Sequence, residues 1–236
     1  MRIKSTVFGI LFSIFFLSSS AADKPLLNEA DSLFKSQKYT QAFAMYQTIL
    51  DQGDVSQAML LKMAFIQDAS GNYADALYYL DRYYLASADR LAVGKIEEIA
   101  TEHELKGYQY NDTHYFLALF KRYKLQALLV LIAFSTLLLV YILRKSQKGE
   151  KPYAAAVLQV LTVSLLLLTI NFKATPNGII TSDATLLRSG PSAGAEPVDV
   201  LLKGHKVIVL DRETVWTKIL WNGEQVFVRN NRLKLI

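Results

Sequence analysis

Two uncharged apolar runs, residues 125–143 and 153–172, constrain the fold of this 236-residue chain more than any other feature. An α-helix needs about 20 apolar residues to cross the hydrocarbon core of a bilayer, and each run has about that length. A core helix of a soluble domain would carry a polar stripe at a spacing of 3.6 residues, which neither run has. Two neighbouring uncharged runs of this length are rare in soluble cores, so the sequence predicts a two-span membrane hairpin rather than a buried soluble one.

A few isolated polar side chains interrupt the two runs. Serine and threonine can bond back to the carbonyls of their own helix, and a polar group can also face the partner helix. We therefore expect the spans to tolerate these residues, which are Gln126, Ser135, Thr136, Gln159, Thr162 and Ser164.

The charges around the hairpin predict its orientation. The linker, residues 144–152, carries an excess of positive charge, and the positive-inside rule places such a linker in the cytoplasm. Residues 1–22 have a basic start, an apolar centre and a small-residue tail with Ser20 and Ala22 at −3 and −1, which predicts a secretory signal peptide. Residues 23–122 and everything after residue 172 are then exported.

Composition limits what the exported parts can do. The chain has no cysteine, which predicts an exported life without disulfide or thiol chemistry. Its net charge is +5, but residues 23–120 contain 14 acidic and 8 basic residues, a net of −6. The positive charge lies mainly in the membrane flanks, where it suits anionic lipid head groups. We therefore predict the lipid bilayer as a partner and no nucleic acid.

A 34-residue period runs through residues 23–122. Ala30 and Ala42 recur as Ala64 and Ala76, and residues 38–50 and 72–85 are two versions of one helix. This pattern resembles the tetratricopeptide repeat, in which small residues let paired helices approach, although Leu80 replaces the expected aromatic residue of the second repeat. An unrelated four-helix bundle is the alternative.

A further helical pair should follow the two repeats. Residues 90–105 predict an amphipathic helix, and Asn111 is expected to cap a helix that runs into the first span. The expected buried side of the first of these helices consists of Leu91, Ile96, Ile99 and Ala100.

Tyrosines are abundant in the repeats and are candidates for binding a partner's peptide or helix. Tyr39, Tyr46 and Tyr73 occupy repeat-core positions, so we expect these to be structural. Tyr78, Tyr79 and Tyr84 cannot all be buried on one helix, and we predict that at least one of them binds a partner.

After residue 172 the chain changes to short runs rich in β-branched and aromatic residues. Asn222-Gly223 lies between two such runs and predicts a type I′ hairpin turn. Residues 178–236 therefore predict an all-β barrel of five or six strands. The order of residues 184–192, 204–210, 216–219, Gly223 and 233–236 resembles the bacterial SH3 domain.

That resemblance implies a ligand surface on the barrel. Its candidate residues are Arg188, Trp216, Trp221 and Phe227, and of these Trp216 is the one that is more often a core residue than a ligand contact. The chain has Val226-Phe227-Val228 where the family usually has Gly-Trp-Val.

Nothing in the sequence predicts an enzyme, a cofactor or a metal site. Gly190–Gly194 matches the G-x-S-x-G pattern around Ser192, but a β-rich run follows it, whereas a nucleophile elbow needs a helix there. Ser32 and Lys35 match S-x-x-K on a repeat helix and lack the companion motifs. The three histidines are far apart and have no zinc-ligand spacing.

The order of modules resembles the BatE-type proteins of the Bacteroides aerotolerance operon. That resemblance implies a non-enzymatic scaffold in the bacterial inner membrane with both modules in the periplasm. It also implies membrane partners that include von Willebrand factor A domain proteins, in an aerotolerance or envelope-stress complex. A peptidoglycan-binding anchor and a sensor are the alternatives, although the short linker offers no cytoplasmic domain to receive a signal.

The predicted fold class is a multidomain membrane protein. Its segments are a signal peptide at 1–22, a tetratricopeptide repeat module at 23–122, a span at 123–143, a cytoplasmic linker at 144–152, a second span at 153–172 and a bacterial SH3 domain at 178–236.

Overall fold

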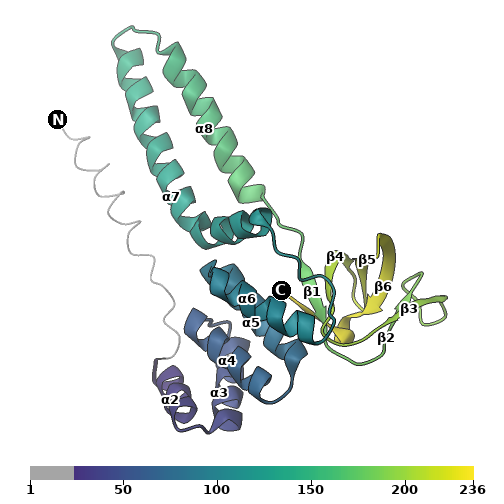
Figure 1. Cartoon of the computed structure of the whole chain (residues 1–236). Coiled ribbons are helices and arrows are strands. Elements are labelled where there is room, and N and C mark those ends of the chain that lie inside the picture. Colours follow the sequence, from purple (N-terminus) through teal and green to yellow (C-terminus); the bar gives the residue numbers. More distant parts are fainter. Residues whose placement is uncertain (1–23) are drawn as a thin grey trace.

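The computed structural model describes residues 24–236, and the predicted signal peptide lies outside them. Within this range the chain forms helices first and strands last (Figure 1). The helices are α2 (Lys24–Lys35), α3 (Tyr39–Asp51), α4 (Gln57–Ala69), α5 (Tyr73–Ser87), α6 (Arg90–Glu102), α7 (Asp112–Gln147) and α8 (Tyr153–Asn171). The strands are β1 (Asn177–Ile180), β2 (Thr185–Arg188), β3 (Pro197–Leu201), β4 (Lys206–Arg212), β5 (Trp216–Trp221), β6 (Glu224–Arg229) and β7 (Leu233–Leu235), with a 3-10 turn, η2 (Asn230–Arg232), before β7.

The helical module, α2 to α6, shows the predicted period. Helices α3 and α5 begin 34 residues apart, at Tyr39 and Tyr73, and α2 and α4 end 34 residues apart, at Lys35 and Ala69. The four predicted small contact residues, Ala30, Ala42, Ala64 and Ala76, are all buried. Small side chains therefore lie where the paired helices pack, as the repeat pattern requires.

The last helix of the module differs from its prediction in two respects. Helix α6 ends at Glu102 instead of residue 105, because His103 caps it and Glu104 adopts a positive φ of 52°. Ile96, Ile99 and Ala100 are buried as expected, but Leu91 is 84% exposed. The prediction for Leu91 is wrong because it lies on the first turn of α6, away from the face that packs on the module.

Helix α7 begins at the predicted cap and continues into the first apolar run. The Asn111 side chain accepts a hydrogen bond from the His114 backbone N–H at 3.1 Å, and the His114 ring satisfies the Asn111 backbone in return. The helix is bent, and its beginning lies across the base of the hairpin (Figure 1).

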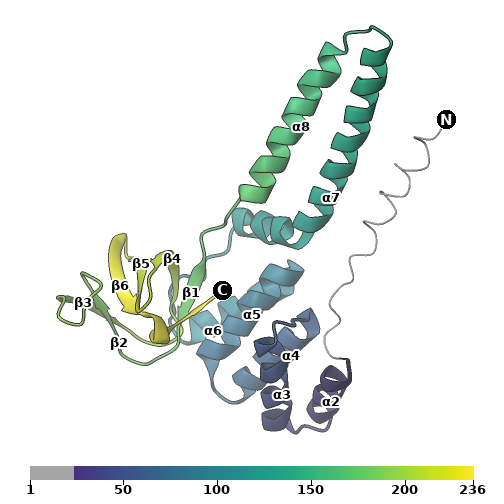
Figure 2. The same cartoon turned by 180° about the vertical axis from the view of Figure 1, so that it is seen from behind.

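Helices α7 and α8 are both long and apolar enough to cross a membrane, and most of their apolar side chains are exposed. The polar residues behave as predicted: Thr136 and Thr162 donate to carbonyls one turn back at 2.8 Å. Gln159 donates to the Ser135 hydroxyl at 2.8 Å across the two helices. The helical module and the strands lie at one end of this hairpin, and the linker lies at the other (Figure 2).

The C-terminal module is an antiparallel sheet in the order β3-β2-β6-β5-β4-β1-β7. Seven strands form instead of the five or six predicted, because strands as short as β1 and β7 leave little alternation in the sequence. Asn222 and Gly223 have φ values of 49° and 85°, and the flanking residues Trp221 and Glu224 are paired. These values fit the predicted type I′ turn, which needs positive φ at both central residues.

Candidate functional site

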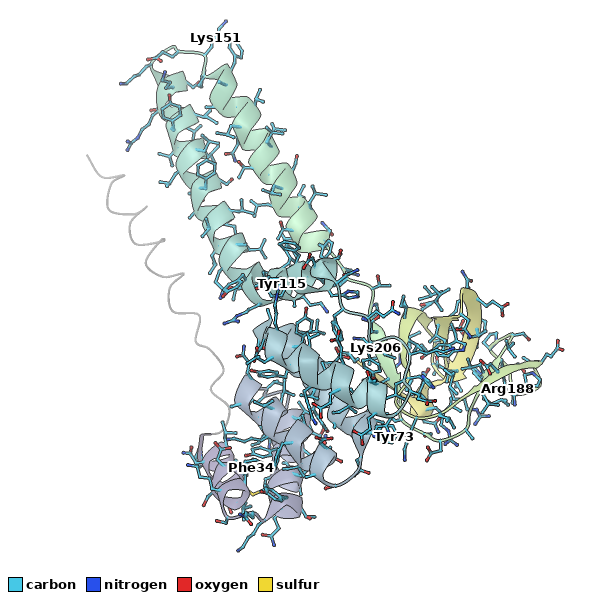
Figure 3. All side chains as sticks on the ribbon, viewed as in Figure 1. Phe34, Tyr73, Tyr115, Lys151, Arg188 and Lys206 are labelled. Atoms are coloured by element: carbon cyan, nitrogen blue, oxygen red, sulfur yellow. The ribbon has the colours of Figure 1, made fainter. Side chains whose placement is uncertain are left out.

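A buried ion pair joins the helical module to the sheet. Lys206 begins β4 and Asp81 lies on α5, and the lysine Nζ is 2.9 Å from both carboxylate oxygens. Both residues are buried, with exposed fractions of 9% and 1%. The Tyr110 hydroxyl donates to the Asp81 carboxylate, and Lys206 Nζ donates to the Tyr110 oxygen at 3.0 Å. Figure 3 shows Lys206 between the helical module and the strands.

The loop between α6 and α7 pairs with the loop before β4. The Tyr108 hydroxyl donates to the Gly204 carbonyl at 2.6 Å, and the Lys206 backbone N–H donates to the Lys106 carbonyl at 3.0 Å. In the other direction the Lys106 backbone N–H donates to Nδ1 of His205 at 3.0 Å. Together with the ion pair, these contacts form what we call the docking junction: Asp81, Lys106, Tyr108, Tyr110, Gly204, His205 and Lys206.

Burial sets the protonation of the junction. Burial raises the pKa of Tyr108 and Tyr110 well above the usual value, and the negative charge of Asp81 raises both further. Both phenols therefore keep their protons and act as donors. Burial, together with the nearby charge of Lys106, lowers the pKa of His205, whose Nδ1 must be unprotonated to accept the Lys106 N–H.

Two glycines permit the close approach of the loops. Gly107 has a φ of 95°, and a Cβ there would collide with the Lys206 carbonyl. Gly204 also has a φ of 95°, and a Cβ there would lie 2.8 Å from Leu105 and 2.9 Å from Tyr73. An L side chain at either position would be strained and would push the two modules apart.

A second set of contacts lies near the C-terminus. Lys234 on β7 forms a 2.7 Å ion pair with Asp75 on α5. Ile179 on β1 and the terminal Ile236 pack with the apolar core of the helical module. Helix α5 is therefore covered by the sheet along much of its length, and the two modules pack as one unit.

A cleft of about 1240 Å³ opens beside the junction. Its walls are the end of α6, the first turns of α7, the segment after α8, β4 and the β5–β6 hairpin. Trp221 lines it, with the Lys106 ammonium 5.6 Å from the indole centroid. The cleft exists only because the modules dock, since its walls come from both of them.

Burial removes two of the predicted binding tyrosines from the candidate list. Tyr79 and Tyr84 are 1% and 2% exposed, and Tyr79 donates to the Gln47 side chain at 3.0 Å. Helix α5 is covered on more than one side, so more of its tyrosines are buried than a surface helix would allow. Tyr78 is half-buried, and its ring lies 5.4 Å from the Lys234 ammonium at the module contact.

The predicted ligand residues of the sheet fall into two places. Arg188 and Phe227 are paired across β2 and β6, and the Lys218 ammonium lies 5.8 Å from the Phe227 ring centroid. We call these three residues the outer patch. Trp221 is buried and lies elsewhere, at the cleft, where its Nε1 donates to Asp199 at 2.9 Å. Trp216 is buried, as predicted.

Sequence reasoning missed the docking junction and an aromatic cluster on the helical module. Asp81 could have been noticed, because it is an acidic residue next to the buried positions Leu77, Leu80 and Tyr84 of one helix. The rings of Phe34, Tyr39 and Phe65 contact one another edge to face with centroids 5.5 to 5.8 Å apart, and Phe65 is 51% exposed.

The rejected catalytic motif has the geometry of a loop. Ser192 lies between β2 and β3, and its hydroxyl accepts the Gly194 N–H at 3.2 Å. The strand–turn–helix arrangement of a nucleophile elbow is missing here, because a strand follows. Residues 24–236 contain no group of three or more His, Cys, Asp or Glu side chains that could hold a metal ion.

Comparison with known families matches one part of the chain. The family model for the bacterial SH3 domain matches residues 183–234. This confirms the predicted bacterial SH3 domain, and the match covers the strands from β2 to β6 and most of β7. A domain of this kind suggests binding to protein or to peptidoglycan. No curated protein and no solved structure matches the chain.

Proposed function

We propose that the chain is a non-enzymatic membrane scaffold that binds proteins through its helical module and its bacterial SH3 domain. The docking junction is the observation that carries this proposal. A buried ion pair is costly to desolvate and adds little net stability, so we interpret the Lys206–Asp81 pair as a device that fixes the relative position of the two modules. The junction therefore holds two modules suited to binding in a fixed relation at one end of the hairpin.

The proposal includes the placement of the chain. Helices α7 and α8 cross the bacterial inner membrane, the linker lies in the cytoplasm and both modules lie in the periplasm. The basic linker supports this orientation, because Arg144, Lys145, Lys148 and Lys151 lie at the end of the hairpin opposite the modules. Reporter fusions after residues 122 and 236 should behave as exported and one after residue 148 as cytoplasmic. A cytoplasmic C-terminus would contradict the two-span topology.

In this proposal the helical module is a tetratricopeptide repeat stack whose aromatic cluster contacts a partner. Phe65 and Leu61, which are 51% and 44% exposed, lie one turn apart on α4. Exposed aromatic groups of this kind are typical anchors of protein interfaces. The partners that the module order supports are membrane proteins with von Willebrand factor A domains, in an aerotolerance or envelope-stress complex.

Crosslinking in native membranes tests the scaffold. Full-length protein is purified after crosslinking, and the co-purifying proteins are identified for Phe65→Ser and Phe227→Ser. Leu91→Ser and Val215→Ser are matched controls, because both native residues are exposed and lie outside the cluster and the outer patch. We expect each test variant to lose at least one protein that the controls keep. Identical sets in all four variants would contradict the proposal.

Peptidoglycan binding is the second candidate, and the outer patch favours it. An aromatic ring beside Arg188 and Lys218 suits a ligand with sugar rings and carboxylate groups. Purified sacculi should then retain the wild-type protein in detergent and retain Phe227→Ser at least about tenfold less, a loss that corresponds to about 1.4 kcal/mol. Equal retention of the two proteins would contradict this candidate.

A further inference from the structure

The first three turns of α7 extend beyond what a membrane span needs. The helix has 36 residues, which is about 54 Å at 1.5 Å per residue, whereas a hydrocarbon core is about 30 Å thick. The extra length, residues 112–124, precedes the apolar run. Figures 1 and 2 show this segment across the base of the hairpin, between the hairpin and the helical module.

One face of this segment is used by the helical module. The Arg90 guanidinium lies 4.1 Å from the Tyr115 ring centroid, Ala118 is fully buried, and Arg122 donates to the Ser87 carbonyl. Residues 115, 118 and 122 are spaced to lie on one side of a helix. Figure 3 shows Tyr115 between the start of α7 and the helical module.

The other face carries aromatic residues that the described chain, residues 24–236, leaves at least partly exposed. Phe116 and Tyr123 are 66% and 47% exposed. Phe120 lies between them on the same face and contacts Phe172 edge to face, with centroids 5.0 Å apart. Because Phe172 directly follows α8, this face lies at the level where the second span ends.

Basic residues surround this aromatic face. Lys124 follows Tyr123, and Lys173 follows Phe172, while Lys121 lines the small cavity beside Asp81 and Lys206 and belongs to the opposite face. The segment contains one acidic residue, Asp112. Lys124 Nζ lies 3.4 Å from the Phe172 carbonyl, which places a positive charge where α8 ends. Aromatic rings together with lysines are characteristic of segments in the interface between lipid and water.

We propose that residues 112–124 form an interfacial helix that binds an anionic phospholipid surface. Phe116 and Tyr123 insert at the boundary between head groups and acyl chains, and the exposed Lys173 after Phe172 contacts lipid phosphates. Because the opposite face is fixed to Ser87 at the end of α5 and Arg90 at the start of α6, the inserted segment holds this end of the helical module at the membrane surface. This inference rests on the proposed membrane-spanning hairpin, which its experiment tests separately.

Fluorescence quenching in lipid nanodiscs tests the proposal, and the absence of cysteine from the chain allows single-site labelling. Full-length variants Phe116→Cys and Tyr123→Cys are labelled with bimane in nanodiscs of phosphatidylcholine and phosphatidylglycerol that carry a spin label high on the acyl chain. Val160→Cys, 65% exposed on α8, reports on the span. Phe65→Cys reports on the helical module away from the hairpin.

We expect the shallow spin label to quench the bimane strongly at residues 116 and 123. A spin label deep in the acyl chain should quench the bimane at residue 160, and neither spin label should quench it at residue 65. Unquenched labels at 116 and 123 with a quenched label at 160 would overturn the interfacial helix and leave the span intact. An unquenched label at 160 would overturn the span and the interfacial helix with it. The same two cysteines can also be labelled with a water-soluble maleimide. If residues 116 and 123 are protected from this reagent in native membranes but react with it in nanodiscs, the face is covered by a protein partner and the lipid proposal is overturned.

Lipid charge gives the second measurement. Replacing phosphatidylglycerol with neutral lipid, or introducing Lys173→Glu, should reduce quenching at residue 116 at least about twofold. Lys151→Glu is the matched control, because Lys151 lies at the far end of the hairpin (Figure 3). Equal quenching in neutral and anionic nanodiscs would overturn the role of lipid charge.

Discussion

The docking junction and the pairing of α7 with α8 are two contacts of opposite chemical character. At the junction, a buried lysine, a buried carboxylate and the Tyr110 phenol contact one another, the Tyr108 phenol donates to the Gly204 carbonyl, and the backbones of two loops pair directly. Between the two long helices, the contact is mostly apolar, with one hydrogen bond between Gln159 and Ser135 and the Lys124 ammonium near the end of α8.

The surroundings of each contact explain the difference. In water, apolar surfaces attract one another without fixing a single relative position. A buried ion pair is costly to desolvate, and we interpret this one as fixing the position of the sheet relative to the helical module. In the lipid surroundings that we propose for α7 and α8, apolar side chains gain little by leaving the solvent, and shape with an occasional polar contact would hold the helices together. The junction therefore depends on a few matched groups, whereas the hairpin does not depend on any single one.

Removing one member of the ion pair should have the largest effect. Lys206→Met leaves the buried Asp81 carboxylate without its partner, and we expect the sheet to lose about 3–5 kcal/mol of stability in the full-length protein. Thermal unfolding in detergent, followed by tryptophan fluorescence, measures this, because both tryptophans lie in the sheet. Asp81→Leu combined with Lys206→Met should recover most of the loss. A double variant no more stable than Lys206→Met would show that geometry elsewhere holds the modules.

Crowding the junction should have the next largest effect. Gly107→Ala places a Cβ against the Lys206 carbonyl at a positive φ, whereas Gly53→Ala has a similar φ of 89° and open space around it. Both variants carry the backbone strain, so the difference between them isolates the collision, which we expect to cost about 1–3 kcal/mol. Limited proteolysis at the loop before β4 should be faster in Gly107→Ala alone. Equal cleavage rates would mean that the loops do not pack this closely.

Acid should weaken the junction and leave the hairpin unchanged. Burial and Lys106 lower the pKa of His205 in the folded chain, against the opposing charge of Asp199, and the pKa of His114 is lowered as well, by burial and by Lys206. As the pH falls through about 6.5, the unfolded chain takes up protons that the folded chain does not, so this stability is present above that pH and is lost below it.

Tryptophan unfolding temperatures at pH 7.5 and 5.5 measure the acid effect. We expect a lower value at pH 5.5 and a smaller decrease for His205→Asn, whose amide oxygen can still accept the Lys106 N–H. A full decrease in this variant would exclude His205 as the source.

The smallest effect is expected in the hairpin. Gln159→Leu removes the hydrogen bond to Ser135 and should cost about 0.6 kcal/mol, a typical value between membrane helices. Unfolding in mixed micelles of increasing sodium dodecyl sulfate, with Ser135→Ala as the second member of a double-mutant cycle, measures the coupling. A coupling above about 2 kcal/mol would mean that the hairpin depends on this contact as strongly as the junction depends on its ion pair.

The sequence by itself determined the local features of this protein. The spacing of Ala30, Ala42, Ala64 and Ala76 predicted which helix faces pack, Asn111 predicted the start of α7, and Asn222-Gly223 predicted the hairpin turn. The threonines in the long helices bond back to their own carbonyls, as expected. These features depend on residues within a few positions of one another, so periodicity and turn chemistry are sufficient to reveal them.

Tertiary structure alone decided the features that depend on distant segments. Asp81 and Lys206 are 125 positions apart, and no local pattern pairs them. Tyr79 and Tyr84 are buried because other helices and the sheet cover α5 on several sides, while Leu91 is exposed because it lies on the side of α6 on which nothing in the described chain packs. Which face of a helix is covered depends on where the rest of the chain folds, since burial follows from packing between elements and not from the helix's own sequence.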